Sequence, residues 1–252
     1  MIEKIQEIVK AAGKMMLNRE NIEVEQKGSV SNLVTNMDKN NQKYIIDKLK
    51  DLYPNAIFFA EEKENEKLTN EYTFVIDPID GTTNYAQDFK FSSISVGLVK
   101  DKKCILAVCY NPYLDEMFTA EKGKGAYLNG KKIEVSSNTL ENSLVTVGTS
   151  PYNKEFANQT FNIAKDIYLK SKDIRRTGSA VLDICYVACS RTDAFFEKRL
   201  SFWDYCAASL ILEEAKGEYL ILDGEFGSKN PVTMLAGNEN NIGEIEKIYR
   251  KY

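Results

Sequence analysis

The pattern of apolar and polar positions predicts helices at the start of the chain. Apolar residues recur every three or four positions over residues 2–16, and they do so again on one side of a predicted second helix from Thr35 to Leu52. Thr35 followed by Asp38 has the S/T-x-x-D/E form of a capping box, and Pro54 follows the end of the same segment. The chain is therefore predicted to begin with two amphipathic helices.

Short apolar runs bounded by turn residues follow these helices. They predict strands at residues 56–60, 72–76, 92–99 and 104–110, and hairpins at residues 100–103 and at Asn129-Gly130. After about Ser136, strands predicted at 144–147, 194–197, 219–222 and 232–235 alternate with helices predicted at 156–169, 181–188, 203–215 and 242–249. We therefore expect two layered halves, an N-terminal α+β half over residues 1–135 and a C-terminal α/β half over residues 136–252.

Composition excludes several kinds of chemistry. The chain has no histidine, so it cannot form a Ser-His-Asp triad, a His-ligated zinc site or an imidazole base. It has 33 Lys and Arg against 37 Asp and Glu, a net charge of −4 that gives no general attraction for nucleic acid or anionic membranes. The five cysteines lack Cys-x-x-Cys spacing, the N-terminus is charged, and no long apolar segment occurs. These features favour a soluble protein of the reducing cytoplasm.

The most informative segment is residues 72–85, YTFVIDPIDGTTNY, in which two aspartates, a glycine and two threonines follow an apolar strand. We expect Pro78 to stiffen the chain so that Asp77 and Asp80 face one point. Two close carboxylates repel unless a cation lies between them, and hard oxygen ligands favour Mg²⁺ or Mn²⁺. Gly81 and the threonines predict a helix start, whose free N–H groups favour phosphate. The alternative is that Asp-Pro and Asp-Gly are ordinary turn formers.

Two further acidic segments favour the metal site over the simple turn. Glu61 and Glu62 follow another apolar strand, and Asp204 lies between the aromatic pair Phe202-Trp203 and the small residues Ala207-Ala208-Ser209. Taken with these segments, the chain resembles the inositol monophosphatase family of Mg²⁺-dependent, lithium-sensitive phosphatases. The resemblance rests on Asp77–Asn84, Glu61-Glu62, Trp203-Asp204, Glu214–Gly217, Leu33–Thr35 with Asp38, and the run from Gly178 to Glu197.

The resemblance implies a fold, an assembly and a metal site. The fold would be a layered αβαβα sandwich of the sugar-phosphatase type, common to inositol monophosphatases and fructose-1,6-bisphosphatases, and the protein would be a homodimer. The active site would hold two to three Mg²⁺ ions. A first ion would bind to Glu61, Asp77 and the carbonyl of Ile79, and a second to Asp77, Asp80 and Asp204. A loosely held third ion would depend on Glu61.

The resemblance also implies roles in catalysis and substrate binding. Thr82 and Asp38 would orient and deprotonate the attacking water, and Glu61 would join them as a catalytic residue through the metal. The residues expected to contact the phosphate and the hydroxyls of a sugar or inositol are Gly81, Thr82, Asp80, Ala180 and Glu197. The substrate would be a small phosphorylated polyol or sugar, with inositol monophosphate as the first choice.

Several alternatives remain open at this point. Fructose 1,6-bisphosphate and histidinol phosphate are the other candidate substrates, and a non-enzymatic regulatory or RNA-associated role is the alternative to catalysis. Arg175 and Arg176 could bind a second phosphate or could be structural. Cys185 and Arg191 have the C-x5-R spacing of cysteine-dependent phosphatases, but no glycine lies between them. We therefore interpret that pair as part of a buried helix.

Overall fold

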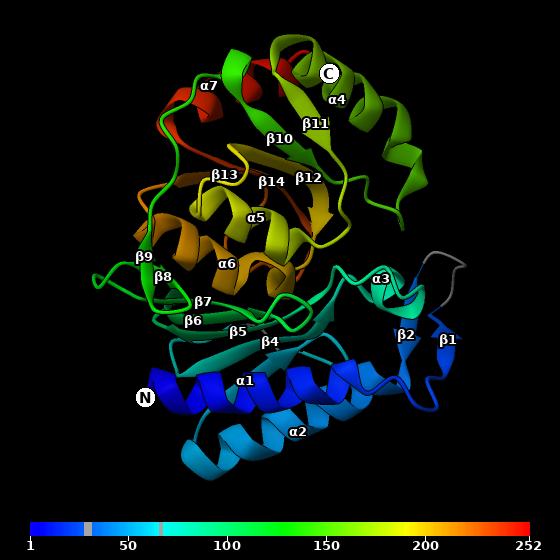
Figure 1. Ribbon diagram of the computed structural model, residues 1–252, viewed down its shortest axis with the longest axis vertical. Coiled ribbons are helices and arrows are strands. Elements are labelled where there is room, and N and C mark those ends of the chain that lie inside the picture. The colour runs from blue at the N-terminus through cyan, green and yellow to red at the C-terminus, as the bar shows by residue number, and fades with distance from the viewer. Residues whose placement is uncertain (28–31, 66–67) are drawn as a thin grey trace.

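The computed structural model describes residues 1–27, 32–65 and 68–252, and in it helices and sheets alternate in five layers (Figure 1). The first layer contains α1 (Ile2–Leu17) and α2 (Asn36–Leu52). These helices pack on a seven-stranded sheet, whose other face contacts α6 (Phe202–Glu214) and, less extensively, α5 (Ala180–Ala188). A five-stranded sheet lies beyond α5 and α6, and α4 (Ala157–Lys170) and α7 (Glu239–Tyr249) cover its outer face. The predicted αβαβα sandwich is confirmed.

The seven-stranded sheet has the order β3-β4-β5-β6-β7-β8-β9. Its strands are β3 (Ile57–Ala60), β4 (Thr73–Asp80), β5 (Ser93–Lys100), β6 (Lys103–Asn111), β7 (Glu116–Glu121), β8 (Ala126–Leu128) and β9 (Lys131–Ile133). Only the β3–β4 pair within it is parallel. Both predicted hairpins are present: Asp101 and Lys102 connect β5 to β6, and Asn129 and Gly130 connect β8 to β9. All four turn residues have positive φ, as the tight turns of two-residue hairpins require.

The five-stranded sheet has the order β11-β10-β12-β14-β13 and mixes parallel with antiparallel pairs. Its strands are β10 (Leu144–Val147), β11 (Asp173–Arg175), β12 (Ala194–Leu200), β13 (Glu218–Asp223) and β14 (Val232–Gly237). Smaller elements complete the fold: β1 (Val24–Gln26), which pairs with β2 (Leu33–Thr35), the helix α3 (Thr82–Ala86), and two 3₁₀ turns at Leu140–Asn142 and Lys154–Phe156.

The sequence of the central helices explains their position between the sheets. In α5 and α6 nearly every side chain is buried, including Val181, Ile184, Tyr205 and Leu210. A helix that is apolar on all sides needs apolar partners on all sides, and the two sheets provide them. One hydrophobic cluster accordingly includes residues of both sheets and of both helices.

The two sheets fall on either side of the predicted boundary near residue 135. All strands of the larger sheet come from residues 57–133, and all strands of the smaller sheet come from residues 144–237. The helices α5 and α6 belong to the later part of the chain, yet they pack against the larger sheet. The division into halves at 1–135 and 136–252 stays a prediction, because this shared core joins them.

The structure corrects two aspects of the predicted elements. β4 continues through Asp77 and Pro78 to Asp80, so the proline lies in a strand and not in a turn after it. Its pairing with β5 shifts between Asp77 and Asp80, which is an irregularity of the kind that tolerates proline. The strands β1, β2, β7 and β11 were not predicted. They are short or are flanked by charged residues, so their apolar alternation is weak.

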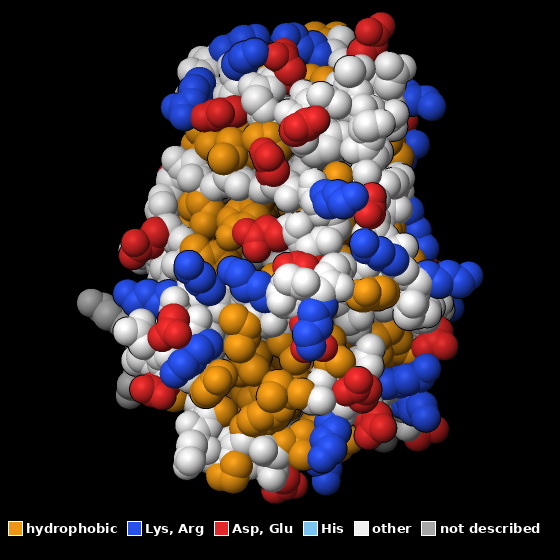
Figure 2. Space-filling model, turned by 90° about the vertical axis from the view of Figure 1, so that its left-hand side faces the viewer, with side chains coloured by type: hydrophobic (Ala, Val, Ile, Leu, Met, Phe, Trp, Pro, Cys, Tyr) orange, Lys and Arg blue, Asp and Glu red, His pale blue; other side chains and the backbone are white. Residues whose placement is uncertain are grey.

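The surface adds two observations. Figure 2 shows apolar side chains in separate areas of one face, with Lys and Arg side chains between them. Within the part of the chain that the structure describes, no helix combines the length and the apolar character that a membrane crossing requires.

Candidate active site

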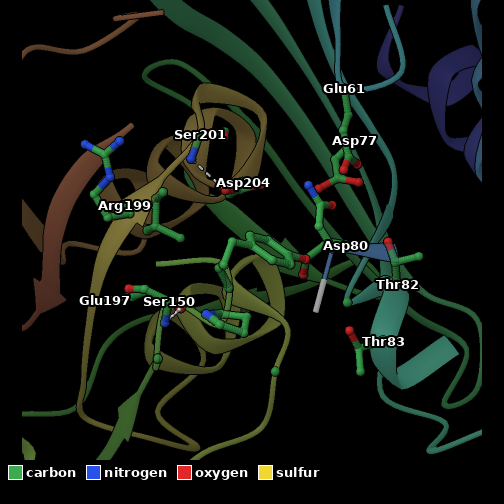
Figure 3. Close-up of a pocket in the computed structure, with 18 of the residues that line it drawn as sticks. Glu61, Asp77, Asp80, Thr82, Thr83, Ser150, Glu197, Arg199, Ser201 and Asp204 are labelled. Carbon is green, nitrogen blue, oxygen red and sulfur yellow. Dashed lines mark hydrogen bonds between the residues drawn. The ribbon is translucent and has the colours of Figure 1, made fainter. Parts of the chain in front are cut away.

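A cavity of about 510 Å³ lies beyond the end of β4, where residues from both halves of the chain meet. Figure 3 shows Glu61, Asp77, Asp80 and Thr82 on one side of this space and Glu197 with Ser150 on the other. The predicted site residues that line it are Glu61, Asp77, Ile79, Asp80, Gly81, Thr82, Ala180, Glu197 and Asp204. Asp38 does not line the cavity and contacts it only through Thr82.

Three aspartates form the most compact group in the cavity. Asp77, Asp80 and Asp204 each offer a carboxylate oxygen, and these atoms all lie within 4.8 Å of one another. The irregular pairing of β4 brings Asp77 and Asp80 to the same side although they are three residues apart. Asp204 lies in the first turn of α6, where it accepts a 2.7 Å hydrogen bond from the backbone N–H of Ser201 in a capping box.

The electrostatics of this group call for a positive charge. Burial, reinforced by the charges of the neighbouring acids, raises the pKa of Asp77 and of Asp204 well above the usual range. Burial raises the pKa of Asp80 to about 6, although hydrogen bonds from Ser179 and from the backbone N–H of Val181 oppose the shift. Ionised carboxylates so close together are stable only with a counter-ion. The three oxygen ligands, none of them nitrogen or sulfur, fit a hard divalent cation such as Mg²⁺.

Glu61 lies at the end of β3, beside the aspartates but outside their compact group. Its backbone N–H donates to the carbonyl of Ile76, which continues the parallel pairing of β3 with β4. Burial raises the pKa of Glu61 to about 8, and the charge of Lys27 opposes that rise. The Nζ atom of Lys27 is 3.6 Å from a Glu61 oxygen and also pairs with Glu62. Sequence reasoning missed Lys27, because nothing in its local pattern marks a site.

Thr82 connects the cavity to Asp38. The Oγ1 atom of Thr82 is 3.1 Å from Asp38 Oδ1 and 3.1 Å from the carbonyl oxygen of Ile79, and its single proton can be donated to only one of them at a time. The predicted capping box at the start of α2 is confirmed, since Thr35 donates its backbone N–H to Asp38 at 2.8 Å. Burial raises the pKa of Asp38 to about 6, against the hydrogen bonds from Thr35 and Thr82.

Glu197 faces the aspartates from β12 (Figure 3). Its carboxylate accepts a 3.1 Å hydrogen bond from the backbone N–H of Ser150 and packs against Gly148, where an added Cβ would lie 1.9 Å from Glu197 Cδ. Only glycine can therefore occupy position 148 without displacing this carboxylate. Burial raises the pKa of Glu197 to about 7, opposed by the hydrogen bond from Ser150 and the charge of Arg176. Gly148 and Ser150 are further site residues that sequence reasoning missed.

The segment before α5 holds Asp80 in place. Ser179 donates its hydroxyl to Asp80, and the backbone N–H of Val181 donates to the same oxygen at 3.1 Å. Gly81 has a φ of +84°, and a Cβ there would lie 3.0 Å from the carbonyl oxygen of Gly178, so glycine allows the two segments to meet. Ser179 has no assigned role in the prediction, although Gly178–Ala180 is among the motifs that carry the resemblance.

Cys185 and Arg191 do not form a thiolate site. Cys185 is fully buried in α5, and burial raises the pKa of its thiol well above the usual range. The guanidinium of Arg191 donates to both carboxylate oxygens of Glu116 and lies over the ring of Tyr186. The C-x5-R spacing is therefore incidental, as predicted.

The layered fold and the cluster of carboxylate oxygens fit the class of metal-dependent phosphatases. Comparison with known proteins identifies the family: a sequence profile described as the inositol monophosphatase family matches residues 1–249. The chain belongs to the inositol monophosphatase family, and the protein is a phosphoric monoester hydrolase.

Individual relatives agree with this assignment. An inositol monophosphatase of Dictyostelium discoideum is 37% identical over 96% of this chain and 92% of its own length. A fructose-1,6-bisphosphatase/inositol-1-monophosphatase of Aquifex aeolicus is 34% identical over 94% of this chain and 88% of its own. The crystal structure of the extragenic suppressor protein suhB from Bartonella henselae matches with a TM-score of 0.87 at 31% identity, covering 98% of this chain and 96% of that one.

Proposed function

We propose that the protein hydrolyses the phosphate ester of a small polyol or sugar with Mg²⁺, and that inositol monophosphate is its first-choice substrate. The observation that carries the metal dependence is the group of three aspartate oxygens within 4.8 Å. The relatives named inositol monophosphatase support the substrate. Asp77, Asp80 and Asp204 would hold one ion. Glu61, Asp77 and the carbonyl of Ile79 would hold another, and Glu61 could retain a third.

Thr82 and Asp38 offer a path for the proton of the attacking water. When bound, Mg²⁺ supplies the Lewis acid that polarises the phosphoryl oxygens and lowers the pKa of water. Thr82 Oγ1 accepts a proton from the water while it gives its own proton to Asp38, 3.1 Å away. With a pKa of about 6, Asp38 is ionised at neutral pH and ready to accept that proton. The products are inorganic phosphate and the free alcohol.

The opposite wall of the cavity suits the polyol part of the substrate. Glu197 presents an acceptor for ring hydroxyls, and Ala180 leaves room beside Asp80 because its side chain is small. The backbone N–H groups of Gly81 and Thr82, at the start of α3, would receive the phosphate.

A phosphate-release assay tests this proposal. We expect release from inositol 1-phosphate with Mg²⁺ and none with excess EDTA. Undiminished hydrolysis in EDTA would reject the metal mechanism. No release from any phosphoester with Mg²⁺ would favour the regulatory or RNA-associated alternative. We keep the prediction that nucleic acid and membranes are not partners and that the protein acts in the cytoplasm.

Arg176 favours a bisphosphate as the second candidate substrate. It lines the cavity, and its Nε atom donates to Thr149 at 3.3 Å, while Arg175 pairs with Asp173 instead. A fork of guanidinium donors suits a second phosphate. Arg176→Ala should then raise KM for fructose 1,6-bisphosphate much more than KM for inositol 1-phosphate. Equal changes for both substrates would assign Arg176 a structural role. Histidinol phosphate, which has no second phosphate, belongs in the same assay panel.

A further inference from the structure

A second cavity, of about 300 Å³, lies apart from the candidate active site. We call it the lysine cavity, and it is lined by Lys102, Lys103, Lys122, Glu213, Tyr219 and Phe226, among others. None of its described lining residues also lines the active-site cavity. The proposed hydrolysis therefore gives this cavity no role.

Three lysines from the larger sheet and its connections line the lysine cavity. Lys102 lies in the turn after β5, Lys103 is the first residue of β6, and Lys122 follows the end of β7. The backbone N–H of Lys122 donates to the carbonyl of Ile105 at 3.0 Å, so its strand end lies beside the start of β6. Among the described residues, no carboxylate pairs with any of the three lysines; the ion pairs nearby use Lys100 and Lys124. The described lining of the cavity therefore contains three lysines and one acid, Glu213, an excess of positive charge.

Two aromatic residues also line the lysine cavity. The ring centroids of Tyr219, on β13, and Phe226, in the following loop, are 6.4 Å apart at an interplanar angle of 37°. Glu213 of α6 adds the single acid among the described lining residues. Burial raises the pKa of Glu213, and the charge of Lys122 opposes that rise. Aromatic rings, an acceptor and unpaired ammonium groups thus border the same space.

We propose that the lysine cavity binds a small aromatic anion. Its flat ring lies against Tyr219 and Phe226, its anionic group meets the lysines, and a donor on the ring reaches Glu213. The volume is at the lower end of the roughly 300–1,000 Å³ that ligand pockets occupy, which suits a molecule of one or two fused rings. The same chemistry occurs in nucleoside monophosphates and in aromatic acids.

The lysine cavity is connected to the active site through α6. Glu213 lies on the same helix as Asp204, about 14 Å along its axis at 1.5 Å per residue. Phe226 packs its ring 5.0 Å from Phe202 and 5.9 Å from Tyr205, the residues that flank Asp204 and Trp203. Phe226 therefore connects the lysine cavity by direct contact to the turn that holds Asp204. Trp203, the single tryptophan, reports on that turn by fluorescence.

Calorimetric titration with naphthalene-1-sulfonate tests the site, since this aromatic anion carries no phosphoester. We expect one molecule to bind per chain, with a dissociation constant at least about tenfold below those of neutral naphthalene-1-sulfonamide and of inorganic sulfate. Affinity should fall as salt rises, and binding should change the Trp203 fluorescence. No binding, or equal affinity for the sulfonate and the sulfonamide, would overturn the proposal.

Matched variants locate the binding. The double variant Lys102→Gln/Lys122→Gln should weaken sulfonate binding by at least about tenfold and leave phosphate release without the probe unchanged. Lys131→Gln, on β9 outside the cavity, is the control and should change neither. Equal loss in the control and the double variant would overturn the site. Displacement of the probe by adenosine 5′-monophosphate would identify nucleotides as the source of the ligand, whereas displacement by benzoate and not by the nucleotide would identify aromatic acids.

Discussion

Asp77 and Asp80 are buried and Asp204 is partly buried, and their clustered charges should reduce the stability of the protein when no cation is bound. Burial raises the pKa of Asp204, and the nearby charges of Asp80 and Glu61 raise it further. Both effects make its ionised form unfavourable. We therefore expect these carboxylates to contribute to cation binding and not to packing. Replacing one of them by a neutral side chain of the same shape should therefore lower turnover without lowering stability.

Asp204→Asn should lower turnover by at least about a hundredfold, because it removes one of three clustered oxygen ligands. The thermal midpoint measured in EDTA should stay the same or rise, because an amide relieves the repulsion while keeping an acceptor for the Ser201 N–H. Asp51→Asn, at an exposed position of α2, is the matched control and should change neither quantity. Near-normal turnover of Asp204→Asn would remove this residue from the metal site.

Glu197 predicts a pH dependence of stability. Burial raises the pKa of Glu197 from 4.5 to about 7, so between these values the folded protein holds a proton that the unfolded chain releases. Its contribution is complete below the unfolded pKa and is lost as pH rises through the folded pKa. In EDTA, the wild type should lose about 1–3 kcal/mol more than Glu197→Gln between pH 5 and pH 8, by urea unfolding. An identical loss in both proteins would contradict the shift.

The residues that sequence reasoning missed are those that tertiary structure alone brings into contact. Lys27 reaches Glu61 from a segment that is distant in sequence, and Gly148 matters only because Glu197 packs against it. The acid cluster of Asp77, Asp80 and Asp204 could be predicted, because acidic residues beside apolar segments can be recognised from the sequence alone. Their contacts with Ser179 and Val181, which hold Asp80, depend on how the two halves meet.

At the scale of elements, helices and tight hairpins could be predicted because their signals are local. The capping box at Thr35 and the Asn129-Gly130 turn were both visible as short motifs. The extension of β4 to Asp80 could not be predicted, because proline normally ends a strand. The irregular pairing with β5 that accommodates Pro78 is visible only in the structure. The strand β7 forms between β6 and β8 and is covered by α6, whereas β11 is an edge strand that pairs with β10 and contacts α4.

The position of Cys185 in α5 gives a prediction about that element. Cys185→Ser should leave turnover close to that of the wild type, because the thiol is fully buried and makes no contact with the cavity. It should cost roughly 1–2 kcal/mol of stability, since it places a hydroxyl among apolar side chains. Turnover is compared with the urea midpoint, with Cys185→Ala as the apolar control. Loss of turnover with native circular dichroism would revive the thiolate interpretation.

At the scale of the whole molecule, the family resemblance predicts a homodimer. Large apolar side chains are exposed at several places, with Phe89 65% and Leu114 57% accessible, and association would cover some of that surface. Light scattering at micromolar concentration should give twice the 28.6 kDa of one chain, which is 57.2 kDa. A mass near 28.6 kDa would contradict the dimer.

The acid cluster also joins the two parts of the chain. Asp77 and Asp80 lie on a strand of the larger sheet, whereas Asp204 lies on α6, which packs between the sheets. A cation among them attracts all three and binds only where they converge, so it stabilises the folded molecule and not the unfolded chain. At about a hundred times its dissociation constant, a ligand of this kind adds about 2.7 kcal/mol to the free energy of unfolding.

Saturating Mg²⁺ should therefore raise the thermal midpoint by about 5–10 °C relative to EDTA, since 1 kcal/mol shifts the midpoint of a chain of this size by roughly 2–4 °C. The shift is measured by calorimetry in the presence and absence of Mg²⁺. In Asp204→Asn, which removes the ligand on α6, the shift should be much smaller, whereas Asp51→Asn should retain it. The same rise in Asp204→Asn as in the wild type would mean that the ion binds without joining the two parts.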